Sequence, residues 1–353
     1  METRRTLLAR LALGLGVAAC GGGRLFAQPA ERAVYAAIET SAHTGLSQAR
    51  FFSATGASVA TAPLDFRAHG LCEDGDRIVV FPRRPGNRFA VMDGTTLEIV
   101  AHVSAPQDKH FYGHGAFTRD GKHLLVTEND LETLAGGIGI YEAKGGFRRV
   151  GQVVLPGSGP HEIVRDPQRD IFYVALGGLQ THPAYGRTPL NLGDFRSQIV
   201  VLEHDTGAIS PMGFWSGTEG VSLRHLSVTG EGRMMVGGQL VDAARGSAQN
   251  VLWHVAGGAV DALEDGVLLD GYVSSVASYG QRTVVTSKES GCVLTFNGAT
   301  LERSNILTGA SAAAFGSREP IASGYAVLRL GGVDVAVSDQ FEFDNHGLSL
   351  RAT

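Results

Sequence analysis

Short apolar segments alternate with polar Asp/Gly turns through most of the chain. The pattern is clearest over residues 114–127, where two apolar segments flank the turn Thr-Arg-Asp-Gly-Lys. Related phrases begin with a histidine at residues 69, 161 and 225. Two apolar strands joined by a polar turn are typical of a β-hairpin. The sequence therefore predicts a repeat of β-hairpins with an imidazole at an equivalent place in each of these copies.

The spacing of these hairpins indicates the architecture. They begin at residues 69, 114, 161, 225 and about 275, with a weaker copy near 313. Four-stranded propeller blades are about 40 to 50 residues long, and one longer interval contains an extra loop at residues 177–198. In the unit that begins at His114 we expect strands at 114–118, 123–127, 138–141 and 150–155. The prediction is an all-β chain forming one β-propeller of seven blades, with six or eight as alternatives because residues 310–345 are poorly patterned.

The two ends of the repeat region complement each other. Residues 33–64 contain three predicted strands but no inner strand, whereas residues 346–350 repeat the His-Gly opening of the hairpins. We expect the last strand to complete the first blade and close the ring.

The first residues are typical of an export signal. Arg4 and Arg5 precede a short apolar run at residues 11–19, as in twin-arginine signals. This run is too short to span a bilayer. The segment ending at Cys20 resembles a lipobox, which would make Cys20 a lipidation site, and ordinary cleavage near Ala27 is the alternative. We therefore expect a signal peptide at 1–27, a propeller at 28–353, and a periplasmic protein that contacts membrane only through a lipid anchor.

Composition narrows the classes of partner. The formal net charge is −5, and the signal peptide takes four of the arginines and one glutamate with it. No run of lysine or arginine follows, which argues against a nucleic-acid partner. Cys72 and Cys292 lie in different repeats, and no Cys-x-x-Cys motif suggests a zinc knuckle or covalent haem.

The candidate metal site follows from propeller geometry. Inner strands begin at one mouth of the central channel, so their histidines should converge there. Imidazole and carboxylate ligands suit iron, copper, zinc or manganese, and a transition metal, iron or copper, is the expected cofactor. The alternative is that these histidines bind neighbouring strands and lock the blades together. The candidate metal ligands are His69, His114, His161, Glu162 and His225.

Loops around the same mouth supply candidate ligand-binding residues. Guanidinium groups there could hold a carboxylate or phosphate, although Arg83 and Arg84 would equally suit a solvated turn. The candidates for contact with a small ligand are Tyr112, Glu128, Asn129, Asp130, His182, Arg187 and Arg224.

Several longer phrases resemble one known family. They are His110-Phe-Tyr-Gly-His-Gly, Thr127-Glu-Asn-Asp, Gly159-Pro-His-Glu, Gly186-Arg-Thr-Pro-Leu-Asn-Leu and Arg224-His-Leu. Over residues 34–297 the chain resembles the bacterial twin-arginine-exported family catalogued as domain of unknown function fifteen-thirteen. The resemblance implies a seven-bladed periplasmic propeller without an established activity. Such proteins tend to be encoded beside imelysin-like and di-haem peroxidase-like proteins, which makes those proteins candidate partners and suggests iron acquisition.

Together these features favour a non-catalytic protein that binds a metal ion or small ligand at a histidine-ringed mouth. One alternative is a metal-dependent enzyme, either a lactonase-like hydrolase or an oxidoreductase. Another is a protein-interaction scaffold with structural histidines. The chain contains no Gly-x-Ser-x-Gly elbow, phosphate-binding loop or dinucleotide fingerprint, so no catalytic residue is assigned.

Overall fold

The computed structural model describes residues 32–213, 215, 217–242, 250–316, 318–337 and 339–350. Arg4, Arg5 and Cys20, on which the predicted export signal and lipidation depend, lie outside the described residues. Within the described part, no helix has the length and apolar character needed to cross a bilayer.

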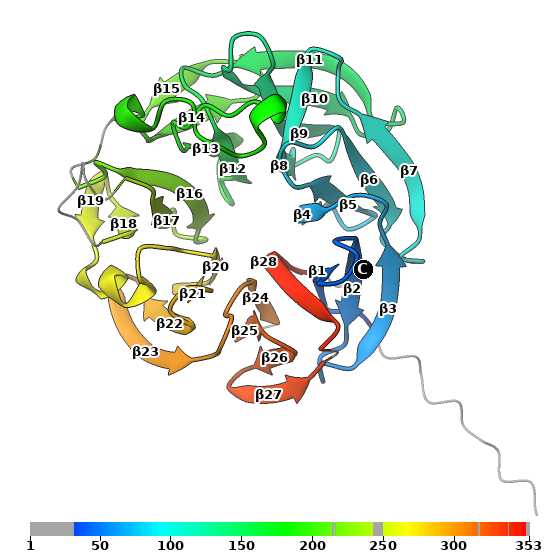
Figure 1. Cartoon of the computed structure of the whole chain (residues 1–353), viewed down its shortest axis with the longest axis vertical. Coiled ribbons are helices and arrows are strands. Elements are labelled where there is room, and N and C mark those ends of the chain that lie inside the picture. Colours follow the sequence, from blue (N-terminus) through cyan, green and yellow to red (C-terminus); the bar gives the residue numbers. More distant parts are fainter. Residues whose placement is uncertain are drawn as a thin grey trace, which may run out of the picture. The chain divides into compact units, whose positions relative to one another are not determined.

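The described chain forms seven four-stranded antiparallel blades arranged in a ring, which confirms the predicted β-propeller (Figure 1). We number the blades I to VII along the chain, each from its inner strand outward. Blade I consists of β28 (Phe341–Ser349), β1 (Tyr35–Ser41), β2 (Ser47–Phe52) and β3 (Ser58–Pro63). Blade II consists of β4 (Ala68–Glu73), β5 (Arg77–Pro82), β6 (Arg88–Asp93) and β7 (Ile99–Ser104).

The next three blades include the long loop. Blade III consists of β8 (Lys109–Phe117), β9 (His123–Asp130), β10 (Gly136–Glu142) and β11 (Arg148–Val154). Blade IV consists of β12 (Pro160–Arg165), β13 (Ile171–Leu176), β14 (Gln198–Glu203) and β15 (Ile209–Pro211), with the short 3-10 helices η1 (Pro183–Tyr185) and η2 (Leu192–Asp194) between β13 and β14. Blade V consists of β16 (Val221–Val228), β17 (Met234–Leu240), β18 (Leu252–Ala256) and β19 (Ala259–Ala262).

The last two blades follow a third 3-10 helix, η3 (Glu264–Leu269). Blade VI consists of β20 (Ser275–Tyr279), β21 (Arg282–Ser287), β22 (Cys292–Asn297) and β23 (Thr300–Ile306). Blade VII consists of β24 (Ala313–Gly316), β25 (Glu319–Gly324), β26 (Val327–Leu330) and β27 (Val333–Ala336). Residues 310–345, which have little sequence pattern, therefore supply a complete blade.

The core is a series of apolar layers between neighbouring blades. Successive side chains of a strand point to opposite faces, and β5 shows the result. Its residues Ile78 and Val80 pack in the layer with blade I, whereas Val79 and Phe81 pack in the layer with blade III. Central strands are therefore apolar on both faces, and each blade is stable only between two others.

Ring closure follows the predicted scheme. β28 lies beside β1 in Figure 1 and pairs with it antiparallel, with Ala37 opposite Gly347 and Tyr35 opposite Ser349. The last described strand is thus the inner strand of the first blade.

One predicted boundary is wrong. β8 begins at Lys109, five residues before the expected start at His114. A register shift between Phe111 and Gly115 allows the pairing with β9 to continue towards the N-terminus, so that Phe111 lies opposite Glu128.

Register shifts occur on five of the inner strands, and each contains or borders a histidine. They lie at residues 68–71, 111–115, 160–162, 223–225 and 343–347. The inner strands β20 and β24 pair without a shift and have no histidine. A bulge bends its strand and redirects a side chain, so these irregularities position the imidazoles.

Candidate functional site

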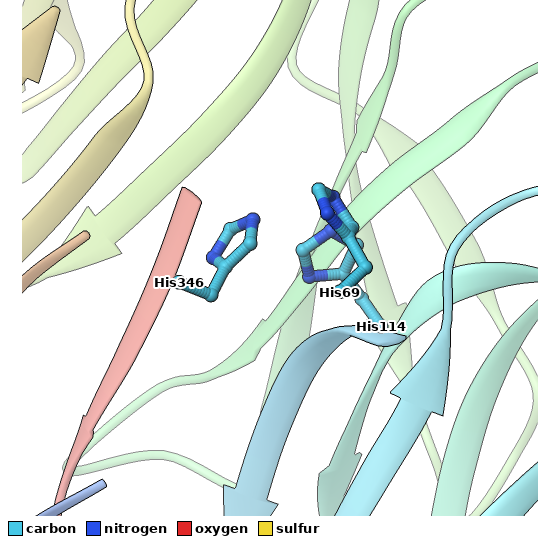
Figure 2. A group of neighbouring side chains, drawn as sticks. All are labelled: His69, His114 and His346. Atoms are coloured by element: carbon cyan, nitrogen blue, oxygen red, sulfur yellow. The ribbon is translucent and has the colours of Figure 1, made fainter. Parts of the chain in front are cut away.

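Five imidazoles from five inner strands converge inside the channel. The neighbouring ring centroids lie between 4.5 Å, for His114 and His346, and 5.9 Å, for His69 and His161. Figure 2 shows the rings of His69, His114 and His346 close together, each from a different blade. All five side chains are buried. We call the following residues the histidine cluster: His69, His114, His161, His225 and His346.

Glycines allow β4 and β8 to approach closely at this point. Gly113 has a φ of +115°, and a Cβ there would lie 2.8 Å from Cδ2 of His69. A Cβ at Gly70 would lie 2.4 Å from the carbonyl oxygen of Gly113. Gly113 is required by both its backbone conformation and this contact, and Gly70 by its contact alone, so close packing of the cluster depends on both glycines.

Two carboxylates contact the cluster. An oxygen of Asp344 lies 2.7 Å from Nδ1 of His69. Glu162 lies between two rings, with one oxygen 3.1 Å from Nδ1 of His225 and the other 3.4 Å from Nδ1 of His114. Each carboxylate accepts a hydrogen bond from an Nδ1–H group, so that the lone pair of a neutral ring lies on Nε2.

The remaining ring nitrogens provide unused ligand atoms. Within the described chain, Nε2 of His114, His225 and His346 and Nδ1 of His161 are buried and have no hydrogen-bond partner. One potential ligand atom from each of His69, His114 and His346 lies within 4.8 Å of the others, and Glu162, His225 and His346 form a second such group. Buried polar atoms are usually satisfied, so these nitrogens are available to coordinate a ligand.

Burial favours the neutral form of four of the five rings. It lowers the pKa of His69 to about 4, although Asp344 opposes the shift. Burial also lowers the pKa of His225, and it holds those of His161 and His346 well below the usual range. Neutral imidazole is the form that coordinates a metal ion.

The carboxyl groups remain ionised. Burial would raise the pKa of Glu162, but His114 and the hydrogen bonds from His114 and His225 hold it well below its usual range. Burial is likewise outweighed at Asp344, whose pKa His69 lowers. The cluster therefore combines imidazole nitrogen donors, four of them on rings whose neutral form burial favours, with two negative charges, a set that suits a transition-metal cation.

The structure brings together all five residues predicted as metal ligands, His69, His114, His161, Glu162 and His225. Sequence reasoning missed His346 and Asp344 as part of the site. The His-Gly phrase at residue 346 was used only to close the ring, although the same signal could have placed a fifth imidazole in the channel.

Two of the predicted ligand-binding residues, Glu128 and Asp130, bind residues outside the histidine cluster. Glu128 accepts from Tyr141 Oη at 2.9 Å and from Arg149 Nη2 at 2.7 Å, and it is buried between strands of blade III. Asp130 accepts from Lys109 Nζ and from the backbone N–H of Thr133, in the turn after β9.

The others have varied environments. Asn129 is buried, and neither its oxygen nor its nitrogen has a partner in the described chain. His182 accepts from the backbone N–H of Ala184 at 3.1 Å and caps η1. Tyr112 Oη accepts from Arg84 Nη1 at 2.8 Å.

Two cavities flank the cluster. One, of about 940 Å³, is formed at the mouth where connections lead into the inner strands, and Arg187, Arg224 and Asp344 line it. The other, of about 920 Å³, lies among the hairpins at the opposite ends of the inner strands, and His114 and Glu162 line it. Residues of the cluster and its carboxylates therefore border both cavities: His114, His346 and Glu162 the second, and Asp344 the first.

Comparisons with known proteins fit this architecture. A family model described as "Protein of unknown function (DUF1513)" matches residues 62–350. No curated protein matches the chain.

Among solved structures, the hydrazine synthase of Kuenenia stuttgartiensis is similar to this chain with a TM-score of 0.61 and 13% identity, covering 90% of this chain and 100% of that one. The β-propeller domain of Cps50 (Swd1) from Myceliophteria thermophila has a TM-score of 0.52 and 12% identity, over 78% of this chain and 86% of that one. At these identities the likeness is one of fold.

Proposed function

This chain belongs to the DUF1513 family, whose function is not assigned, and we propose that it binds a transition-metal ion, iron or copper, at the histidine cluster without catalysing a reaction. The observation that carries the proposal is the set of unpartnered buried Nε2 atoms on His114, His225 and His346. Leaving such groups unsatisfied costs about 1–3 kcal/mol each, and an ion bound between them would recover that cost.

The contacts of Glu162 and Asp344 with the imidazole rings also support metal binding. Metal-binding histidines commonly donate their other ring N–H to a carboxylate, which fixes the ring and raises its basicity. Glu162 and Asp344 stand in that relation to three rings of the cluster. A role limited to locking blades would leave the Nε2 atoms of His114 and His225 without partners.

Location and partners extend the proposal. The paired arginines at residues 4 and 5 favour export to the periplasm, with Cys20 as a lipid anchor if the lipobox is used. A metal-acquisition role beside imelysin-like or di-haem peroxidase-like proteins is the setting that the family resemblance favours. Periplasmic fractionation of cells expressing the native chain and its Arg4→Lys/Arg5→Lys variant tests export to the periplasm.

The test of metal binding is elemental analysis of protein exported through its native pathway and purified without chelators or nickel resin. We expect close to one ion per chain in the wild type and loss of that ion in the double variant His114→Gln/His346→Gln. His254→Gln is the matched control, because His254 is also buried but lies on β18, away from the channel. Thermal unfolding establishes that each variant is folded.

Absence of metal from the wild type, together with an unchanged melting temperature on adding iron(II), copper(II) or zinc, would contradict the proposal. The histidines would then be blade locks, and the protein-interaction scaffold would become the better account.

A catalytic use of the same ion is the second candidate, because the 920 Å³ cavity reaches His114, Glu162 and His346 and offers a substrate a route to the cluster. A metal ion there could polarise a carbonyl or activate water. Turnover of lactone substrates by the metal-loaded protein, abolished by His114→Gln/His346→Gln, would favour the hydrolase over the binder.

A further inference from the structure

The cavity at the other mouth has a different chemical character. Its volume of about 940 Å³ lies within the range of small-molecule sites. Five arginines line it, and they come from blades II, IV and V and from the connections into these blades. They are Arg67, Arg83, Arg84, Arg187 and Arg224. We call this the arginine cavity.

These guanidinium groups lack counter-ions. In the described part of the chain, none of the five forms an ion pair with a carboxylate. Nε of Arg224 is buried without a hydrogen-bond partner. Three carboxylates line the cavity beside them, but Asp344 is engaged by His69 and Glu342 by Lys288. The third, Glu289, leaves a clear excess of positive charge.

The like charges are close enough to perturb one another. Arg83 is the main cause of a lowered pKa at Arg187, followed by burial and by Arg84 and Arg67. Holding cations together in this way costs free energy, and an anion between them would recover it.

The Arg84 side chain and the loop that carries Arg187 are held in place by contacts within the protein. Arg84 donates to Tyr112 Oη at 2.8 Å, and its guanidinium lies 4.8 Å from the centre of that ring. The loop that carries Arg187 is closed by Asn191, which accepts from the N–H of Gln180 and donates to the carbonyl of Gly178. Preorganised donors lose little entropy on binding.

We propose that the arginine cavity binds a small organic anion with two or more carboxylate or phosphate groups. Guanidinium pairs both kinds of oxyanion in a bidentate manner, and several spaced arginines match several spaced anionic groups better than one. The cavity is too small for a folded partner. The proposal goes beyond metal binding and depends on different residues, so either can fail without the other.

The test is calorimetric titration of the whole metal-free protein with four probes: propane-1,2,3-tricarboxylate, pyrophosphate, acetate and inorganic phosphate. We expect saturable binding of one of the first two, at least tenfold tighter than its singly functional counterpart. Whichever polyanion binds more tightly identifies the carboxylate or phosphate class. Affinity should fall as salt rises, because the attraction is electrostatic.

Variants separate the cavity from general surface charge. Arg187→Gln and Arg224→Gln should each weaken the polyanion at least tenfold, whereas Arg148→Gln, which removes an exposed arginine paired with Glu142, should leave binding unchanged. His114→Gln/His346→Gln should bind the anion normally, which distinguishes this site from the metal site.

Melting temperature provides a second measurement. Arg187→Gln should melt at or above the wild-type temperature without ligand, because a repelling charge is removed. Binding of both polyanions weaker than about 1 mM, or an equal loss of affinity in Arg148→Gln, would overturn the proposal.

Discussion

At the scale of single residues, the site depends on which atom of each imidazole is used. Glu162 holds Nδ1 of both His114 and His225, and Asp344 holds Nδ1 of His69. For these three rings the carboxylates leave Nε2 as the free atom, and burial favours the unprotonated form of His69 and His225. The presence of a histidine in the sequence predicts neither which ring nitrogen is free nor whether the ring is protonated.

Gly113 tests whether the cluster depends on close backbone packing. Gly113→Ala adds a Cβ at a φ of +115° and 2.8 Å from His69, and we expect it to lower the free energy of unfolding by about 2–4 kcal/mol. Gly146→Ala is the control, because it has a φ of +71° with no atom within 4 Å, and should cost about 1 kcal/mol. Urea denaturation measures both, and equal losses would show that steric contact with His69 is unimportant.

His110 gives a pH dependence that is independent of the cluster. Burial lowers its pKa to about 4 from 6.5. The unfolded chain therefore binds a proton that the folded chain does not, and stability falls as pH drops from 6.5 towards 4. At pH 4 this residue should cost about 2–3 kcal/mol relative to pH 7.

His110→Gln should remove that part of the pH dependence. We expect the stability of the variant, measured by urea denaturation at pH 7 and pH 4, to change less between the two values than that of the wild type. Identical changes would mean that His110 is protonated in the folded state without penalty.

At the scale of elements, the strands could be predicted from the sequence but the bulges within them could not. The hairpin pattern predicted the strands and placed His69, His114, His161 and His225 on inner strands. It did not reveal that the chain shifts register at each of these positions. A bulge depends on the partner strand as well as on its own residues, so a single repeat cannot show it.

Glu128 illustrates the same limit. Its place beside Asn129 and Asp130 near the end of β9 made it a candidate ligand-binding residue. Side chains alternate along a strand, however, and the neighbouring strands determine what each one contacts. Tyr141 and Arg149, from the next two strands, bind both of its oxygens. Those contacts depend on the register of β9, β10 and β11, which the sequence pattern did not specify.

Glu128→Gln separates the two roles. The amide cannot pair with Arg149 as a carboxylate does, so we expect a loss of about 2–4 kcal/mol in unfolding free energy with unchanged metal content. Urea denaturation and elemental analysis provide the two measurements. Loss of the ion with unchanged stability would instead make Glu128 part of the metal site.

At the scale of the whole molecule, the sequence predicted the ring and its closure but not the composition of its centre. Asp344 and His346 lie far along the chain from His69, and they meet it only because β28 completes blade I. The poorly patterned residues before β28 concealed blade VII, whose inner strand β24 is short and has Phe315 as its one large apolar residue.

Removal of β28 should therefore affect fold and site together. A chain that stops at residue 340 exposes the edge of β1 and loses the inner strand of blade I. We expect it to aggregate or to lose its cooperative thermal transition, followed by circular dichroism. Addition of a peptide of residues 341–350 should restore part of that transition by strand addition, and a shortened chain that melts like the full one would refute this role.

β28 also determines when the histidine cluster can form during synthesis of the chain. His346 is synthesised long after His69, and the two meet only when the last strand has joined the first. On the proposed function, an interrupted or misfolded chain would lack one imidazole and one carboxylate of the cluster and would bind the ion less tightly. Bound metal would then distinguish a chain whose ring is closed from one whose ring is still open.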